Sequence, residues 1–275
     1  MSVKSKLVAI SKLARSFSQK PRLSFQGLRN LEESVRGSVY AEAWPCGAEG
    51  RSNPASADEN LIDSSNPLRE YFNSHKTGRG IWKWTHYFEI YHRHFSKFVG
   101  REVHVVEVGV YSGGSLDMWK QYFGPRCHVY GIDIEPACKT YEDAKTRIFV
   151  GDQADRAFWS DFRNQVRSVD VLIDDGGHFP EQQIATLEEM LPHLRPGGVY
   201  LCEDVHNLHN PFAAYVSGLA DSINAVRKDE GVPTDFQREI HSVHFYPYVA
   251  VIEKCERPKQ ELIAPRHGTE WQPFL

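Results

Sequence analysis

The sequence predicts an α/β fold: a Rossmann-like, doubly wound sheet of seven strands, mostly parallel, with an antiparallel C-terminal hairpin. Three observations predict it. Short β-branched runs alternate with helical stretches between residues 103 and 204, the pattern of parallel strands joined by crossover helices. These strands are almost continuously apolar, as expected where helices cover both faces of a sheet. Two further strand-like runs meet at Tyr246-Pro247, and so short a connection makes an antiparallel hairpin.

The elements follow in order along the chain. In residues 67–100, aromatic side chains recur at three- and four-residue steps, which predicts two amphipathic helices before the first strand. Strands are expected at VHVVEVGV (103–110), HVYGIDI (128–134), IFVGD (148–152), VDVLIDD (169–175) and GVYLCED (198–204), with the hairpin in EIHSVHFYPYVAVIEK (239–254). Helices are expected at 114–123, 156–166, 180–194 and 212–226.

Composition divides the chain into four segments. We expect a basic arm and linker that is poorly ordered (1–66), a helical cap segment (67–100), the α/β domain (101–256) and a C-terminal tail (257–275). Residues 1–31 hold seven Lys or Arg and no acid, with Leu7, Ile10, Leu13 and Phe17 at helical spacing. Such a segment is either an organelle transit peptide or an arm that stays mobile or packs on a partner subunit, as in a homo-oligomer.

Bulk composition argues against several classes of protein. No run of 18 apolar residues occurs, so no membrane span is expected. Residues 32–275 carry 25 basic and 36 acidic side chains, a net charge of −11, which argues against a nucleic-acid partner. The five cysteines are scattered without a Cys-x-x-Cys pair, so neither a disulfide framework nor a zinc knuckle is indicated. A reducing, cytoplasmic location is the expectation.

A glycine-containing loop ends the first strand and opens a helix, within VVEVGVYSGGS (105–115). Its pattern is Glu107-x-Gly109-x-x-x-Gly113, and Tyr111 stands where a dinucleotide fingerprint has its second glycine. A bulky pyrophosphate is therefore disfavoured. A smaller anionic group, such as an amino-acid carboxylate, fits the positive end of the following helix better.

The next two strands also end in polar residues. Asp133 closes the second strand 20 residues after Gly113, where a carboxylate can accept both hydroxyls of a ribose. Asp152 and Gln153 follow the third strand, within reach of an adenine. The alternative is purely structural, with the glycines serving turns and Asp133 capping a helix.

A second cluster of acids follows the fourth and fifth strands. Asp174, Asp175 and His178 follow the fourth, and Glu203-Asp204 follows the fifth, with His206 and His209 further along. Because these strand ends share one edge of a parallel sheet, the carboxylates would repel one another unless a cation lay among them. Oxygen ligands favour Mg²⁺, and the histidines leave Mn²⁺ or Fe²⁺ open. Alternatively, the acids are helix caps or solvated loop residues.

The motifs ExGxxxG, GIDIEP and FVGDQAD, in this order, resemble the class I S-adenosylmethionine-dependent methyltransferases over roughly residues 80–255. The resemblance implies that Glu107, Gly109 and Gly113 hold the methionine part of the cofactor. It implies that Asp133 binds the ribose and that Asp152 and Gln153 lie beside the adenine. Neighbouring loop residues are counted with them as cofactor-binding candidates: Tyr111, Ser115, Ile134 and Asp174.

IDDGGH followed by EDVHNLH is similar to the metal-dependent macrolide-sugar O-methyltransferases of the mycinamicin type, and to the rhamnosyl O-methyltransferase and cephalosporin-hydroxylase-like group. The resemblance implies that Asp175, Glu203 and Asp204 are metal ligands. It also implies that His178 is the general base, so that His178 and Asp175 are the catalytic pair. The segment before residue 101 does not look like that family's substrate-recognising domain, so the acceptor is left open.

The expected function is an S-adenosylmethionine-dependent, Mg²⁺-dependent O-methyltransferase. Its acceptor would be a hydroxyl of a small molecule, either a sugar or a glycosylated natural product. Two alternatives stay open: a metal-dependent oxygenase or hydrolase-like enzyme on the same fold, and a non-catalytic cofactor-binding subunit. The role of Asp174 is the least defined of the assignments.

Overall fold

The computed structural model describes residues 11, 14–43, 66–226 and 231–270. The chain divides into two units, residues 1–62 and 63–275, and each is described by itself. The first unit contains helix α2 (Pro21–Glu42), and the expectation that residues 1–66 are poorly ordered stays a prediction. Pro21 stands in the first helical turn, where its missing N–H costs nothing, and no further proline follows before Pro45. Leu7, Ile10, Leu13 and the linker 50–65 lie outside the described residues.

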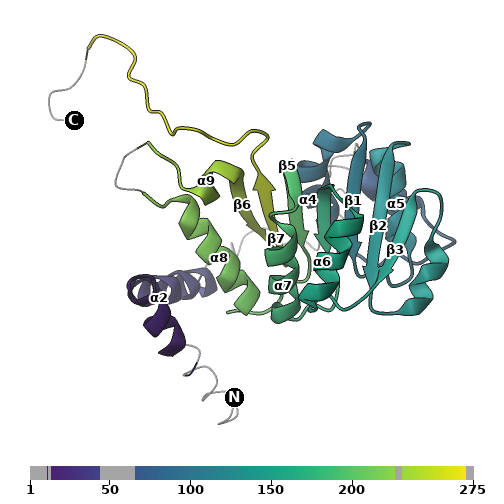
Figure 1. Cartoon of the computed structure of the whole chain (residues 1–275), viewed down its shortest axis with the longest axis horizontal. Coiled ribbons are helices and arrows are strands. Elements are labelled where there is room, and N and C mark those ends of the chain that lie inside the picture. Colours follow the sequence, from purple (N-terminus) through teal and green to yellow (C-terminus); the bar gives the residue numbers. More distant parts are fainter. Residues whose placement is uncertain (1–10, 12–13, 44–65, 227–230, 271–275) are drawn as a thin grey trace, which may run out of the picture. The chain divides into compact units, whose positions relative to one another are not determined.

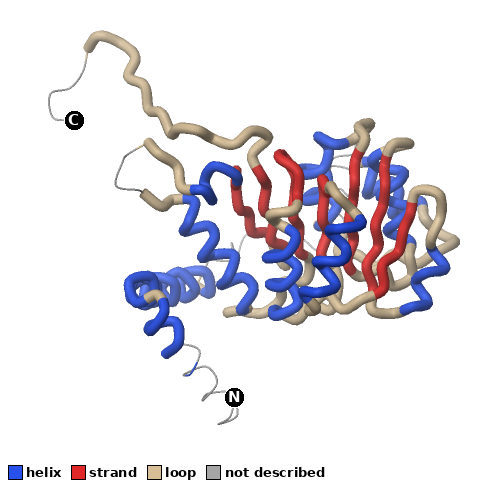
Figure 2. Tube along the Cα trace, viewed as in Figure 1, coloured by secondary structure: helices blue, strands red, loops and turns tan. Residues whose placement is uncertain are grey.

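The second unit is built on one seven-stranded sheet (Figures 1 and 2), in the order β3-β2-β1-β4-β5-β7-β6. The strands are β1 (Val103–Val108), β2 (Cys127–Asp133), β3 (Thr146–Val150), β4 (Val169–Asp174), β5 (Leu194–Cys202), β6 (Ile240–Tyr246) and β7 (Val249–Lys254). Strands β1 to β5 pair in parallel, whereas β7 is antiparallel to both β5 and β6. The predicted fold class, including the closing hairpin, is confirmed.

Helices cover both faces of this sheet. They are α3 (Pro67–Ser74), α4 (Tyr87–Phe95), α5 (Gly114–Phe123), α6 (Arg156–Gln165), α7 (Pro180–Met190), α8 (Pro211–Ile223) and α9 (Asp235–Glu239), with short 3₁₀ turns at Ser96–Phe98 and Pro136–Tyr141. Two apolar clusters separate the layers: α3, α4 and α5 pack on one face, and α6, α7 and α8 on the other (Figure 1). Alternate strand residues feed the two clusters, as the two-residue period of a strand requires.

Two boundaries differ from the sequence prediction by four residues. The helix expected over 180–194 ends at Met190, and β5 begins at Leu194 rather than at residue 198. Pro192 cannot donate the hydrogen bond that would continue the helix. Helix α9 was not predicted: it is five residues long and depends on a capping box between Thr234 and Gln237.

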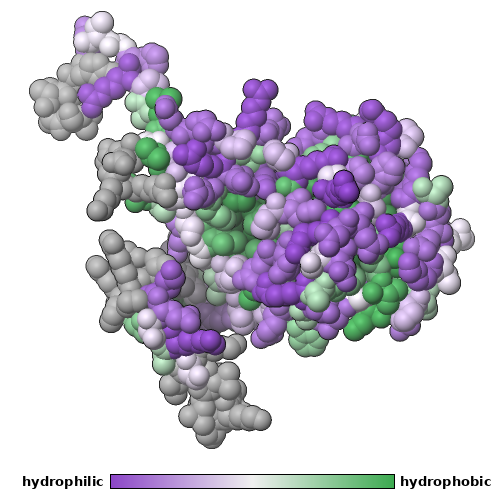
Figure 3. All heavy atoms as spheres, in the orientation of Figure 1, coloured by the Kyte–Doolittle hydropathy of each residue, from purple (hydrophilic) through white to green (hydrophobic). Residues whose placement is uncertain are grey.

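Hydrophilic residues dominate the visible face of the second unit, with apolar patches between them (Figure 3). Within the described ranges, no helix combines the length and apolar character that a membrane crossing requires. Residues 257–270 of the tail contain neither helix nor strand.

One buried ion pair ties the cap segment to the hairpin and predicts a pH dependence. Although burial opposes it, the hydrogen bond from His94, at 2.6 Å, and the charge of Lys97 lower the pKa of Glu253 to about 2. A carboxyl with a depressed pKa stabilises the fold above its unfolded pKa, and the gain is lost as the pH falls from about 4.5 toward 2. Glu253→Gln should therefore lower the free energy of unfolding by about 2 kcal/mol at pH 6 and by much less at pH 3.

Urea unfolding of wild type and variant at both pH values measures this difference. Glu89→Gln is the matched control, because Glu89 is 59% exposed and lies 3.7 Å from Arg69. That change is expected to cost less than about 0.5 kcal/mol at either pH. A Glu253→Gln penalty that is equal at pH 6 and pH 3 would contradict the assignment.

Candidate active site

A cleft of about 1000 Å³ lies at the carboxyl ends of β1, β2, β4 and β5 and is bordered by residues 80–87. All of the predicted site residues except Glu107, Gly113 and Asp174 line it. This is where an open α/β sheet binds ligands, because loops after neighbouring parallel strands diverge there. The structure therefore brings the glycine loop and the second acidic cluster into one cavity.

Gly109 is required by the loop after β4 rather than by a ligand. Its φ is +88°, and a Cβ at this position would overlap the carbonyl oxygen of Asp175. The amide of Asp175 donates to the carbonyl of Val108 at 2.9 Å, which draws the two loops together. The glycine thus allows the catalytic candidates after β4 to lie directly beside the predicted cofactor loop.

Gly109→Ala is expected to lower the free energy of unfolding by about 3 kcal/mol, because backbone strain and steric overlap act together. Gly124→Ala is the matched control: its φ is +95°, but nothing lies within 4 Å of the added Cβ. It should cost only about 1 kcal/mol, the strain alone. Urea unfolding and S-adenosylhomocysteine titration of both variants check this, and equal penalties would show that the Asp175 carbonyl moves aside.

The start of α5 closes the glycine loop. Gly113 has a φ of +75°, and a Cβ there would lie 2.8 Å from the ring of Tyr141. Glu107 is buried beneath the loop and accepts a 2.8 Å hydrogen bond from the hydroxyl of Ser115, which does line the cleft. The free N–H groups of this helix start can bind the anionic end of a ligand.

Asp133 fastens the loops after β1 and β2 together. One of its oxygens accepts from the amides of Val110 and Tyr111, at 2.9 and 3.0 Å, and the other from the amide of Glu135 at 2.9 Å. The oxygen that accepts from Glu135 alone keeps a second lone pair, so Asp133 retains acceptor capacity for one ribose hydroxyl. Tyr111 and Ile134 are 75% and 69% exposed and line the same part of the cleft, which gives it an apolar rim.

Asp152 and Gln153 differ in what they can offer a ligand. Asp152 lines the cleft and uses one oxygen to accept from the amide of Ala154. The Gln153 amide, by contrast, donates to Asp174 and Thr186 and accepts from the amide of Gly177. Both of its donor hydrogens are used within the protein, so its visible role is to hold the loop after β4.

Asp174 is placed away from the predicted cofactor site. It is 1% exposed, does not line the cleft, and accepts from Gln153 at 3.0 Å and from the hydroxyl of Tyr200 at 3.1 Å. Burial raises its pKa, against the effect of these hydrogen bonds. The expectation that Asp174 binds the cofactor is therefore corrected: successive strand residues point to opposite sides, and only Asp175 faces the cleft.

A lysine that sequence analysis missed lies among the acids. Lys83, from the segment before α4, places its ammonium nitrogen 2.5 Å from Asp175 and 2.9 Å from Glu203. Glu107 is 3.7 Å from the same nitrogen. The predicted repulsion between carboxylates is thus offset, in this structure, by a side-chain cation. Lys83 stands between two tryptophans in IWKWTH, and no spacing rule in the sequence marks it as a site residue.

The Glu203 carboxylate is buried and is bonded by side chains of the cap segment. Its oxygens accept from Lys83 and, at 2.6 Å, from the hydroxyl of Tyr91. Burial and the neighbouring Asp175 raise the pKa of Glu203, and the charge of Lys83 opposes this shift. Both partners of Glu203 come from the cap segment, so this segment completes the site.

Asp204 faces the open part of the cleft and is held in place by aromatic donors. The hydroxyl of Tyr87 donates to it at 2.7 Å and the indole N–H of Trp84 at 3.2 Å. His178 Nε2 lies 3.6 Å from its other oxygen. His178 and Asp204 have φ values of +58° and +54°, a conformation that non-glycine residues adopt rarely and mostly at functional sites.

The donor set fits a hard divalent cation. Ligand atoms of Asp175, His178 and Asp204 all lie within 4.8 Å of one another, and no other such group occurs among the residues that the structure describes. Two carboxylates with room for water or hydroxyl oxygens suit Mg²⁺, which keeps several such ligands. The structure thus groups Asp175 and Asp204 with His178, whereas Glu203 is paired with Lys83.

Trp84 and His206 line the cleft beside Asp204, and Tyr248 packs against both from outside the cleft lining. The ring of Tyr248 lies 4.5 Å from His206 and 5.5 Å from Trp84, measured between centroids. His206 Nε2 is 3.5 Å from Asp204. This aromatic wall of Trp84 and His206 offers flat apolar faces next to the predicted metal position.

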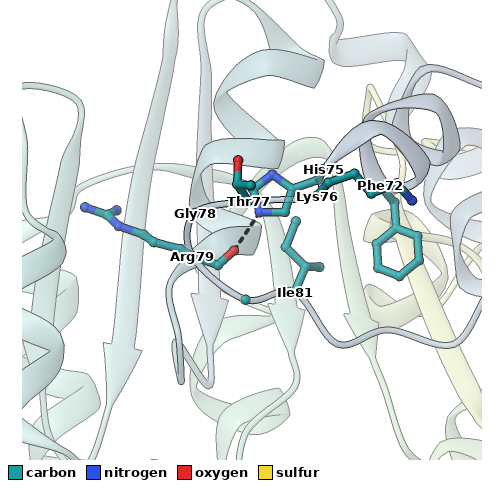
Figure 4. Close-up of a pocket in the computed structure, with 8 residues that line it drawn as sticks. Phe72, His75, Lys76, Thr77, Gly78, Arg79 and Ile81 are labelled. Carbon is teal, nitrogen blue, oxygen red and sulfur yellow. Dashed lines mark hydrogen bonds between the residues drawn. The ribbon is translucent and has the colours of Figure 1, made fainter.

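A second, shallower pocket of about 330 Å³ lies behind the loop that leads to Lys83 (Figure 4). His75 and the carbonyl of Arg79 form a 2.7 Å hydrogen bond across it, and the Arg79 guanidinium lies 4.7 Å from the Tyr141 ring centroid. A Cβ on Gly114 would lie 2.5 Å from the carbonyls of Arg79 and Gly80. The loop therefore rests directly on the start of α5.

The chain is similar to known methyltransferases. Residues 106–205 match a family model described as "Methyltransferase domain". The chain is 32% identical over 201 residues to 8-demethyl-8-alpha-L-rhamnosyl tetracenomycin-C 2'-O-methyltransferase of Streptomyces olivaceus, covering 64% of this chain and 52% of that protein. It is 31% identical over 188 residues to mycinamicin VI 2''-O-methyltransferase of Micromonospora griseorubida, covering 60% and 47%.

A solved methyltransferase structure is also similar to this chain. The MycE methyltransferase of the mycinamycin biosynthetic pathway, in complex with Mg, SAH and mycinamycin VI, matches with a TM-score of 0.59 and 28% identity over 69% of this chain and 53% of that chain. The chain spans about half the length of the curated relatives it matches. The predicted resemblance to class I methyltransferases, and to their sugar O-methyltransferases, is confirmed.

Proposed function

We propose that this chain, which carries a methyltransferase domain at residues 106–205, transfers a methyl group from S-adenosylmethionine to a hydroxyl of a small molecule. The acceptor class is a sugar or a glycosylated natural product, and a divalent cation, Mg²⁺ first, assists. One observation carries the proposal: Asp175, His178 and Asp204 converge in the same cleft as the glycine loop. The five curated relatives are all named O-methyltransferases, and three of these names contain a rhamnosyl or olivosyl group, which favours neither an oxygenase nor a silent subunit.

Each part of the cofactor would bind at one of the loops that follow the parallel strands. Its amino-acid end would bind at the start of α5, beside Gly109, Gly113 and Ser115, where helix N–H groups favour a carboxylate. Its ribose would bind at Asp133, and its adenine between Ile134 and Asp152. The transferable methyl group would then point toward Asp175 and the aromatic wall.

The acceptor hydroxyl would bind between Asp175 and Asp204. A bound divalent cation would lower the pKa of that hydroxyl and fix its orientation. His178 would accept the released proton at its ring nitrogen. Tyr87 and Trp84 hold Asp204 in one orientation, so the alignment needed for an in-line displacement is largely built before binding.

The acceptor's ring would lie against Trp84 and His206, which line the cleft. Aromatic faces suit the apolar C–H face of a sugar ring, while its hydroxyls remain free to meet the carboxylates. Trp84 is half exposed and bonds Asp204 at the same time, so one side chain serves both the ring and the metal position.

Two measurements test the proposal. Calorimetric titration with S-adenosylhomocysteine, with and without Mg²⁺, should show cofactor binding in both conditions. Transfer of labelled methyl from S-adenosylmethionine to a panel of glycosides should then require Mg²⁺ or Mn²⁺. No cofactor binding would overturn the proposal as a whole. Binding without transfer to any hydroxylated acceptor would favour a non-catalytic subunit.

A further inference from the structure

Lys83 is the most deeply buried cation of the site. Its side chain is 3% exposed, and its ammonium nitrogen lies 2.9 and 3.1 Å from the two oxygens of Glu203 and 2.5 Å from one oxygen of Asp175. Glu107, 0% exposed, is 3.7 Å away. An ammonium removed from water is stable only if carboxylates surround it at such distances.

The surroundings hold this lysine in place. Neighbouring Trp84 donates to Asp204, and the carbonyl of Thr85 accepts from Arg69 at 3.1 Å. On the other side, Glu203 is fixed by Tyr91 and by a backbone bond from its amide to the carbonyl of Asp174 at 2.9 Å. Both partners are anchored independently of each other, so the ion pair does not depend on a free loop.

Asp175 is shared between two cation positions. One of its oxygens bonds Lys83, with Glu203 and Glu107 behind it: this is the inner position. A carboxylate oxygen of Asp175 also lies within 4.8 Å of ligand atoms of His178 and Asp204: this is the outer position. The inner position has three carboxylates and is filled by an ammonium; the outer one has two carboxylates and faces the acceptor side.

We propose that Lys83 permanently fills the inner position and so keeps Glu203 and Glu107 out of the ligand set of the divalent ion. The ion is then held at the outer position by Asp175 and Asp204, with a lower affinity than three carboxylates would give. This rests on the proposed function and deepens it. Lys83 is a positioning residue that sets where the ion binds and how tightly.

Mn²⁺ binding to the full chain, followed by electron paramagnetic resonance of the free ion without cofactor or acceptor, tests this. Asp204→Asn should weaken Mn²⁺ binding by about a hundredfold or more, whereas Glu203→Gln should weaken it by less than about tenfold, as expected for a nearby charge that is not a ligand. Lys83→Met should tighten binding by about tenfold or more, since a repelling charge is removed and Glu203 becomes free.

The double variant Lys83→Met/Glu203→Gln should return to within a few fold of wild type. It removes the buried pair together, so it also remains informative if Lys83→Met alone does not fold. Loss of Mn²⁺ binding in Glu203→Gln as severe as in Asp204→Asn would overturn the inference alone, because the ion would then displace Lys83. No Mn²⁺ binding by the wild type would overturn it together with the metal half of the proposed function, with cofactor binding still able to support the other half.

Discussion

A His178→Ala variant is expected to transfer methyl groups about 10² to 10⁴ times more slowly than wild type, the range typical of a lost general base. S-adenosylhomocysteine should bind with unchanged affinity, because the His178 ring lies 3.6 Å from Asp204, on the side of the cleft proposed for the acceptor. Single-turnover rates and calorimetric titration separate these two effects.

His209→Ala is the matched control. His209 also has a positive φ, +61°, and also follows an acidic strand end, but it does not line the cleft. Its replacement should leave the rate within about twofold of wild type, as for surface changes remote from a site. If His178→Ala loses Mn²⁺ affinity as strongly as Asp204→Asn does, His178 is a ligand rather than the base; an unchanged rate would remove it from both roles.

The residues that sequence analysis located correctly share one physical feature: they stand directly after parallel strands. Carboxyl ends of such strands meet at one edge, so Asp133, Asp175 and Asp204 could be placed in one cleft from strand order alone. The direction of each side chain was harder to judge. Asp174 and Asp175 are adjacent, and the two-residue period of a strand sends one of them into the interior and the other to the cleft.

Lys83 could not be placed in this way. It lies 92 positions before Asp175 and 120 before Glu203, and it reaches them from a segment without regular secondary structure. A positive group was expected among these carboxylates because they would otherwise repel one another, and the Lys83 ammonium does lie among them. What the sequence could not show is that tertiary packing supplies an ammonium at that point, whereas a divalent ion was expected there.

A second large effect is expected in the core that supports this arrangement. Trp119 of α5 is 0% exposed and packs edge-on against Tyr91 and Phe95 of α4, with centroids 5.2 and 6.0 Å apart. Trp119→Ala should lower the free energy of unfolding by about 4 kcal/mol, because a large cavity opens between the two helices. Urea unfolding measures this cost.

Trp119→Ala should also disturb the active site. Tyr91 both packs on Trp119 and donates its hydroxyl to Glu203 at 2.6 Å, so a loosened ring frees one partner of the buried acid. Trp119→Phe keeps an aromatic ring in contact with Tyr91 and should cost less than about 1.5 kcal/mol. If both variants retain wild-type Mn²⁺ affinity while only Trp119→Ala loses stability, the contact serves packing alone. A matching loss of Mn²⁺ affinity in Trp119→Ala would instead show that the aromatic layer of the cap segment fixes the inner carboxylates, and through them the ion.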